Sequence, residues 1–91
     1  MATHVVHLPQ AQRFEAAFGG ETAICEYRRQ GPLLTLFHTE VPPRLQGQGI
    51  ASELVAAALA WARAEGLRVR PSCSYVAAYM QRHPETQDLL E

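Results

Sequence analysis

The sequence has only two cysteines, Cys25 and Cys73, among its 91 residues. Two thiols cannot form the framework of a disulfide-rich secreted domain, and their spacing does not fit a zinc site built on thiolates. The four histidines are scattered, and no two of them stand at i and i+4, the helical spacing of paired metal ligands. The sequence therefore predicts no metal site and two reduced thiols, as in a cytoplasmic protein.

Long apolar runs and an excess of one charge are also absent. No stretch approaches the roughly 18 apolar residues of a membrane span, and the apolar residues near the N-terminus are too interrupted for a signal-peptide core. The formal net charge is −1 with histidine neutral. These features predict no membrane and no nucleic-acid partner. The length predicts one small domain over 1–91, which we expect to be a monomer.

The first half of the chain has the pattern of an antiparallel meander. Strands are predicted over 13–18, 21–29 and 33–41, after a weaker strand pattern over 3–8. Gly19-Gly20 indicates a two-residue hairpin with a type I′ turn, which needs positive φ at both positions. The last of the three strands stops at Pro42-Pro43, because proline cannot donate to a sheet ladder.

The second half predicts the order helix, strand, helix. The first helix runs from about Gly49 to Glu65, and its apolar stripe consists of Ile50, Leu54, Val55, Ala58, Leu59 and Ala62. A strand follows over 67–71 and a second helix over 74–82, ended by Pro84. The strand after the helical crossover can lie parallel to the strand before it. We therefore expect an α+β domain with a mixed sheet, whose two parallel strands part beside the loop between them.

That loop is the candidate anion site. Residues 46–51, Gln-Gly-Gln-Gly-Ile-Ala, connect an apolar strand to an alanine-rich helix. The first N–H groups of a helix have no intrahelical partner, and the helix dipole adds about half a positive charge there. Glycine lets a phosphate approach such a backbone closely. An ordinary strand–helix connection is the alternative interpretation.

Two common phosphate loops are excluded. A Walker loop needs Gly-Lys and then Ser or Thr, whereas Gly49 is followed by Ile50. Gly47, Gly49 and Ser52 come close to a dinucleotide-binding pattern, but the acidic residue expected about 20 positions further on is absent. The remaining pattern over 46–51, Gln-x-x-Gly-x-Ala, looks like the pyrophosphate loop of the GNAT N-acetyltransferase superfamily.

Three segments together make the resemblance specific. They are His-Thr-Glu-Val-Pro-Pro at 38–43, the loop at 46–51, and Cys-Ser-Tyr-Val-Ala-Ala-Tyr at 73–79, followed by Arg-His-Pro at 82–84. Over about 13–90 the chain resembles the small single-domain GNAT-like acetyltransferases of the YjdJ type. It departs from the family pattern at Ser74, where family members usually have proline.

The resemblance implies acetyl-CoA as the cofactor. The N–H groups of the loop would hold the pyrophosphate, side chains nearby would add contacts, and the strand before the loop would lie along the pantetheine arm. The predicted cofactor-binding residues are Glu40, Val41, Arg44, Gln46, Gly47, Gln48, Gly49, Ile50, Ala51, Cys73, Tyr75 and Arg82.

Four residues are candidates for the chemistry. Cys73 precedes a predicted helix, whose N-terminus favours a thiolate. Glu40, or His38 on the same strand face, could take a proton from an amine. Tyr79 shares a helix face with Tyr75, and a tyrosine near this place protonates the leaving thiolate in larger GNAT enzymes. Each of these residues also has an alternative interpretation as a packing or solvated residue.

The predicted function is acetyl transfer from acetyl-CoA to an amine. Direct transfer with Glu40 as the base and a covalent route through Cys73 are both open. The resembled family lacks the N-terminal helices that shape the acceptor site in larger GNAT enzymes, so the acceptor is expected to be a protein or a small exposed amine. The alternative is a module that binds CoA or acetyl-CoA without efficient turnover.

Overall fold

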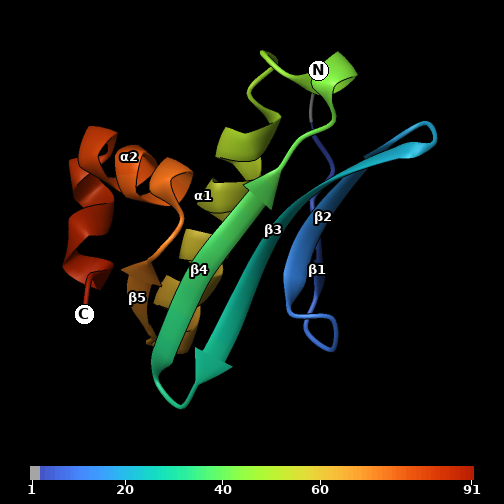
Figure 1. Ribbon diagram of the computed structural model, residues 1–91. Coiled ribbons are helices and arrows are strands. Elements are labelled where there is room, and N and C mark those ends of the chain that lie inside the picture. The colour runs from blue at the N-terminus through green and yellow to red at the C-terminus, as the bar shows by residue number, and fades with distance from the viewer. Residues whose placement is uncertain (1–2) are drawn as a thin grey trace.

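The computed structural model describes residues 3–91 as one five-stranded mixed sheet with helices against it (Figure 1). The strands are β1 Val6–Leu8, β2 Arg13–Phe18, β3 Glu21–Gln30, β4 Leu33–Glu40 and β5 Arg68–Pro71, and the helices are α1 Ile50–Glu65 and α2 Ser74–Arg82. Two short 3₁₀ helices, Pro43–Leu45 and Pro84–Leu89, complete the fold. Neighbouring strands pair in chain order, antiparallel except for the parallel pair β4–β5. The predicted α+β meander followed by α-β-α is confirmed.

The β2–β3 hairpin differs from its prediction in one respect. Phe18 pairs with Glu21, so the connection has the two expected residues. Gly19 has φ +62°, but Gly20 does not have positive φ. A type I′ turn is therefore wrong, and positive φ at the first central residue alone is the pattern of a type II′ turn.

Helix α1 packs against one face of the sheet and buries its apolar side in the core. Its buried residues are the six of the predicted stripe, Ile50, Leu54, Val55, Ala58, Leu59 and Ala62. Gly66 ends the helix in the left-handed region at φ +70°, and its N–H bonds back to the carbonyls of Ala62 and Arg63, as a C-terminal cap requires. The helix packs mainly on β2 and β3. It is long enough to connect β4 to a parallel β5 at the sheet edge.

The C-terminal segment closes the β5 edge of the sheet. Leu90 forms an isolated parallel bridge to Val69. The Arg63 guanidinium on α1 donates to both carboxylate oxygens of Asp88, at 2.8 and 2.9 Å.

No described helix is long and apolar enough to cross a membrane.

A β-bulge divides β4 into two parts. Tyr27 of β3 pairs with Leu36, and the preceding Glu26 pairs with His38, so Phe37 is an extra residue on β4. An extra residue reverses the alternation of side chains beyond it. Leu34 and Leu36 face the buried core before the bulge, whereas after it the odd-numbered residues do.

Removal of a core side chain tests this packing. Leu54 is 0% exposed, and Leu54→Ala should lower the free energy of unfolding by about 2–5 kcal/mol, because it leaves a cavity between α1 and the sheet. Leu90→Ala is the matched control, since Leu90 is 39% exposed and should lose less than half as much. Urea unfolding of both variants measures this. Equal losses would contradict the description of the core.

Candidate functional site

The loop before α1 presents unpaired backbone N–H groups. Gly47 and Gly49 have φ of +83° and +81°, a conformation that favours glycine. Gly49 is the N-cap, no side chain caps the helix, and the first bond at this end is from the Glu53 N–H to the Gly49 carbonyl at 3.1 Å. The N–H groups of residues 50–52 therefore have no partner within the helix and are available to an anion.

A cavity of about 260 Å³ lies against this loop. It is lined by Val41, Leu45, Gln46, Gly47, Gly49, Ile50, Ala51 and Tyr75. Six of the predicted loop and strand residues thus line the same cavity as Tyr75, which lies in the first turn of α2. Sequence reasoning did not choose Leu45.

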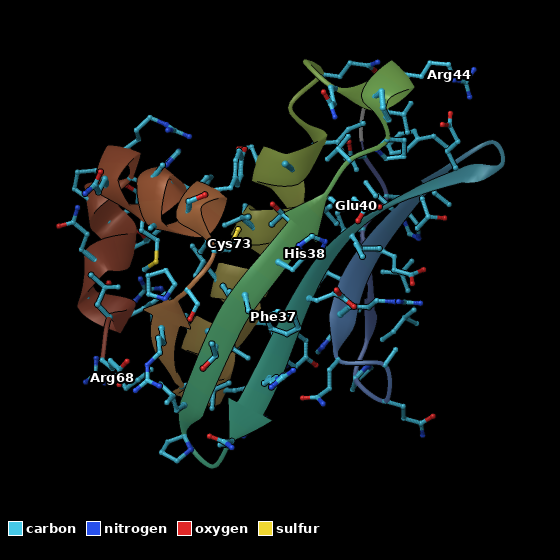
Figure 2. All side chains as sticks on the ribbon, in the orientation of Figure 1. Phe37, His38, Glu40, Arg44, Arg68 and Cys73 are labelled. Atoms are coloured by element: carbon cyan, nitrogen blue, oxygen red, sulfur yellow. The ribbon has the colours of Figure 1, made fainter. Side chains whose placement is uncertain are left out.

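The two parallel strands part next to this cavity, as predicted. β5 pairs with β4 only from Leu33 to Leu36, and β4 continues to Glu40 without it. The Cys73 N–H still donates to the Leu36 carbonyl at 3.1 Å, after which the chain turns into α2. Cys73 therefore lies where the strands separate (Figure 2).

Hydrogen-bond donors surround the Cys73 sulfur. The Thr39 hydroxyl lies 3.7 Å from Sγ. Burial raises the pKa of the Cys73 thiol, but the N–H groups of Val76 and Tyr75 together with the hydroxyl and N–H of Thr39 outweigh burial, so the pKa lies below its usual value. Burial instead raises the pKa of Cys25 to about 12, with smaller contributions from Cys73 and Glu26.

The two predicted bases lie on the opposite face of the sheet from this thiol. His38 and Glu40 pair across the ladder with Glu26 and Ile24, on the face away from the core, because of the bulge. The His38 Nε2 lies 3.2 Å from a Glu40 carboxylate oxygen, and the side chains are 45% and 67% exposed. They share a face, as predicted. They are not the partners of Cys73.

Some predicted cofactor residues lie outside the cavity. The Arg44 Nε donates to the Glu21 carboxylate at 2.7 Å, on the side of the β2–β3 hairpin (Figure 2). Gln48 is exposed beside the cavity, and Arg82 is exposed at the far end of α2. The Gln46 amide donates to the Val41 carbonyl at 2.9 Å, so this side chain holds the loop to β4.

Tyr79 lies one turn beyond Tyr75 on α2 and is buried. Its ring stacks on His83 with 3.9 Å between ring centroids. Burial raises the pKa of Tyr79, with smaller contributions from Glu85 and Tyr75. Tyr79 does not line the loop cavity.

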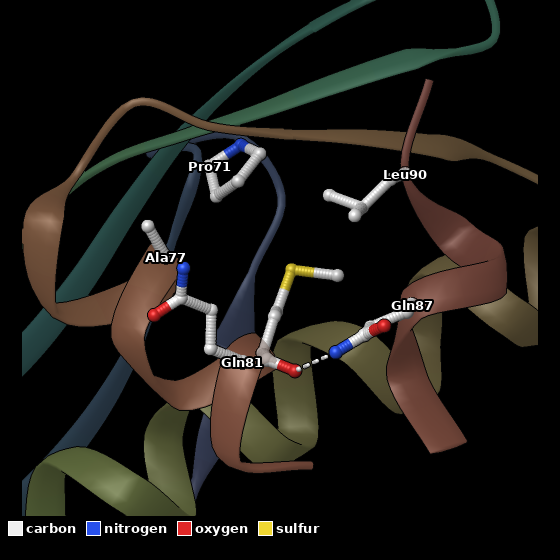
Figure 3. A pocket seen from close by; sticks show the side chains of 6 residues that line it. Pro71, Ala77, Gln81, Gln87 and Leu90 are labelled. Atoms are coloured by element: carbon white, nitrogen blue, oxygen red, sulfur yellow. Dashed lines mark hydrogen bonds between the residues drawn. The ribbon is translucent and has the colours of Figure 1, made fainter. Parts of the chain in front are cut away.

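A second cavity, of about 390 Å³, lies between β5, α2 and the C-terminal segment (Figure 3). It is lined by Pro71, Ala77, Met80, Gln81, Gln87 and Leu90. The Gln87 amide spans it and donates to the Met80 carbonyl at 3.2 Å. It is larger than the loop cavity but holds no predicted site residue. Within residues 3–91 no group of three His, Cys, Asp or Glu side chains is arranged to hold a metal ion.

Thr39 is a site residue that the sequence did not predict, although it lies within the 38–43 segment. Strict alternation from the buried Leu34 and Leu36 would place Thr39 on the outer face. The bulge at Phe37 instead pairs it with the buried Cys25 and turns it towards Cys73.

Comparison with known proteins agrees with this fold. Residues 13–89 match the family model of the GCN5-related N-acetyltransferases, so the chain belongs to that family. The NMR solution structure of a GCN5-like protein from Staphylococcus aureus superposes with a TM-score of 0.77 at 23% identity. The match covers 97% of this chain and 87% of that one, so both proteins have the same small fold.

Alkylation tests the environment of the two thiols. Iodoacetamide should modify the native protein once, at Cys73, with a half-maximal rate at a pH below the usual value of about 8.5, because the pKa of this thiol is lowered. Cys25 should react only after unfolding. Mass spectrometry with Cys73→Ser as the control measures this. Alkylation of native Cys25 would contradict the structure.

Proposed function

We propose that this protein transfers an acetyl group from acetyl-CoA to an amine. Membership of the GCN5-related N-acetyltransferase family supports an acetyltransferase. The observation that carries the finer proposal is the cavity that joins the loop of unpaired N–H groups to Tyr75, beside the opening between β4 and β5. The donors suit a pyrophosphate, and the opening suits an extended thioester arm.

The residues of the loop have separate roles in this proposal. The N–H groups of residues 50–52 bind the pyrophosphate, and Gly47 and Gly49 permit its close approach. A Cβ at either glycine would meet nothing within 4 Å, so the backbone faces open space there. Gln46 fixes the loop to β4 through the Val41 carbonyl rather than by touching phosphate. Arg44 would have to leave Glu21 before it could contribute.

Two routes for the acetyl group use different faces of β4. In the direct route, Glu40, or a water that it orients, takes a proton from the amine, which attacks the thioester carbonyl: a bond forms between nitrogen and the acetyl carbon, the bond from that carbon to the CoA sulfur breaks, and CoA leaves as a thiolate. In the covalent route, the Cys73 thiolate attacks first: a bond forms between Sγ and the acetyl carbon, the bond from that carbon to the CoA sulfur breaks, and CoA leaves as a thiolate. An amine then attacks the acetyl carbon, the bond from that carbon to Sγ breaks, and the proton lost by the amine goes to the departing Cys73 sulfur.

A module that binds acetyl-CoA without efficient turnover is the second candidate. It is favoured by the outer face of β4, where His38 and Glu40 are exposed and line neither of the two cavities described above. CoA release with a panel of amines separates the two functions. Chromatography should measure the release, because Cys73 would itself react with a thiol reagent.

Substitution in the loop tests cofactor binding. Gly49→Val should weaken acetyl-CoA binding at least tenfold, about 1.4 kcal/mol, because the side chain projects from a left-handed residue into the space for phosphate. Gly66→Val is the matched control: this residue caps the other end of α1 at φ +70° and suffers the same backbone strain far from the loop. NMR titration of folded variants gives the affinities. Equal affinity in both variants would refute the placement.

Intact-mass spectrometry tests the covalent route. After incubation with acetyl-CoA, an acetyl adduct should form on the wild-type chain and be absent from Cys73→Ala. The eight basic residues counted as Lys and Arg are all arginine, so a side-chain adduct cannot be an acetyl-lysine. Full turnover by Cys73→Ala without any wild-type adduct would leave only the direct route.

A further inference from the structure

The bulge at Phe37 has a chemical consequence at the sulfur of Cys73. It places Thr39 opposite Cys25, on the helix side of the sheet, and brings its hydroxyl to 3.7 Å from Sγ. We propose that Thr39 is a positioning residue for Cys73: its hydroxyl donates a hydrogen bond to the sulfur, fixes the sulfur where β4 and β5 part, and favours the thiolate over the thiol. The catalytic use of this thiolate rests on the proposed function, whereas the pairing of the two residues does not.

The backbone fixes both members of the pair. Thr39 is held by the β3–β4 ladder through its pairing with Cys25. Cys73 is held from both sides, because its N–H donates to the Leu36 carbonyl and its carbonyl accepts the first bond of α2, from the Ala77 N–H at 3.0 Å. Neither contact depends on a flexible surface side chain. The two residues therefore face each other before any ligand binds.

The surroundings leave Thr39 as the side chain that can stabilise this thiolate. From α2, the N–H groups of Tyr75 and Val76 favour the anion. On β3, the Cys25 thiol interacts electrostatically with Cys73. Cys25 stays protonated, because burial raises its pKa to about 12. No charged side chain among the described residues contributes to the lowered pKa of Cys73. His38 and Glu40 lie across the sheet.

Thr39→Val is the decisive variant, because it keeps the branching at Cβ and removes the hydroxyl. The pH at half-maximal iodoacetamide alkylation of Cys73 should rise by about one unit, since hydrogen bonds to a charged sulfur favour its ionised form. Thr39→Ser should restore the wild-type value. Iodoacetamide is uncharged, so its approach does not itself depend on the charge of the site.

Thr35→Val is the matched control. Thr35 is another half-buried threonine of β4, but it pairs with Arg28 on the outer face and does not contact Cys73. Its alkylation profile should equal that of the wild type. The proposal is overturned if Thr39→Val leaves the profile unchanged, or if Thr35→Val shifts it equally. Should Thr39→Val fail to fold, as judged by its amide NMR spectrum, Thr39→Ala carries the same test.

The pH dependence of the rate of acetyl-adduct formation provides a readout that a merely structural role would not move. A raised pKa in Thr39→Val leaves less thiolate at low pH, so its rate should fall several-fold at pH 7 and approach the wild-type rate at alkaline pH. A variant that only disturbed packing would lose the same factor at every pH. Failure of acetyl-CoA to bind would refute the proposed function, yet the alkylation profiles, measured without acetyl-CoA, would still decide the role of Thr39.

Discussion

The parallel pairing of β4 with β5, and its end at Leu36, is the constraint on which the rest of this small structure depends. Parallel strands need a crossover, and α1 supplies it together with six buried residues of the core. Because the crossover begins at the carboxyl end of β4, the N-terminus of α1 lies beside the point where the strands separate. The same point receives Cys73 and the N-terminus of α2 from the end of β5. One pairing thus brings two helix N-termini and one thiol together.

Much of this arrangement could be predicted from local patterns. The stripe of α1 was predictable residue by residue, because one helical period and one buried face determine it. For Gly47 and Gly49 the sequence predicted close approach of a phosphate, and the structure adds that both are left-handed, a backbone that few other residues adopt. The start of α2 at Ser74 was also predicted, although serine replaces the usual proline at this first helical position. Such features depend on neighbours in sequence.

The bulge could not be predicted in the same way. Residues 33–37 form a nearly continuous apolar run, and such a run carries no alternation from which an extra residue could be detected. One extra residue nevertheless moves every later side chain of the strand to the opposite face of the sheet. For this reason the sequence correctly indicated that His38 and Glu40 share a face of the sheet, but it did not indicate which face. It also did not predict that Thr39 faces the core side. The ion pair between Arg44 and Glu21 could not be predicted either, because the two residues are distant in sequence and the position of the β2–β3 hairpin brings them together.

The bulge also determines what the two transfer routes demand of an acceptor. His38 and Glu40 lie on the exposed face of the sheet, whereas the Cys73 sulfur lies on the helix side, with β4 between them. An amine that loses its proton to Glu40 must approach from the exposed face and reach the thioester past the end of β5. An amine that displaces Cys73 must instead enter the opening between the strands, where Tyr75 and the loop already line the cavity. Under the proposed function, an acceptor on a protein surface would use the first approach and a slender amine the second. The acceptor and the route are therefore linked, because the face from which the amine arrives fixes which side chains it can meet.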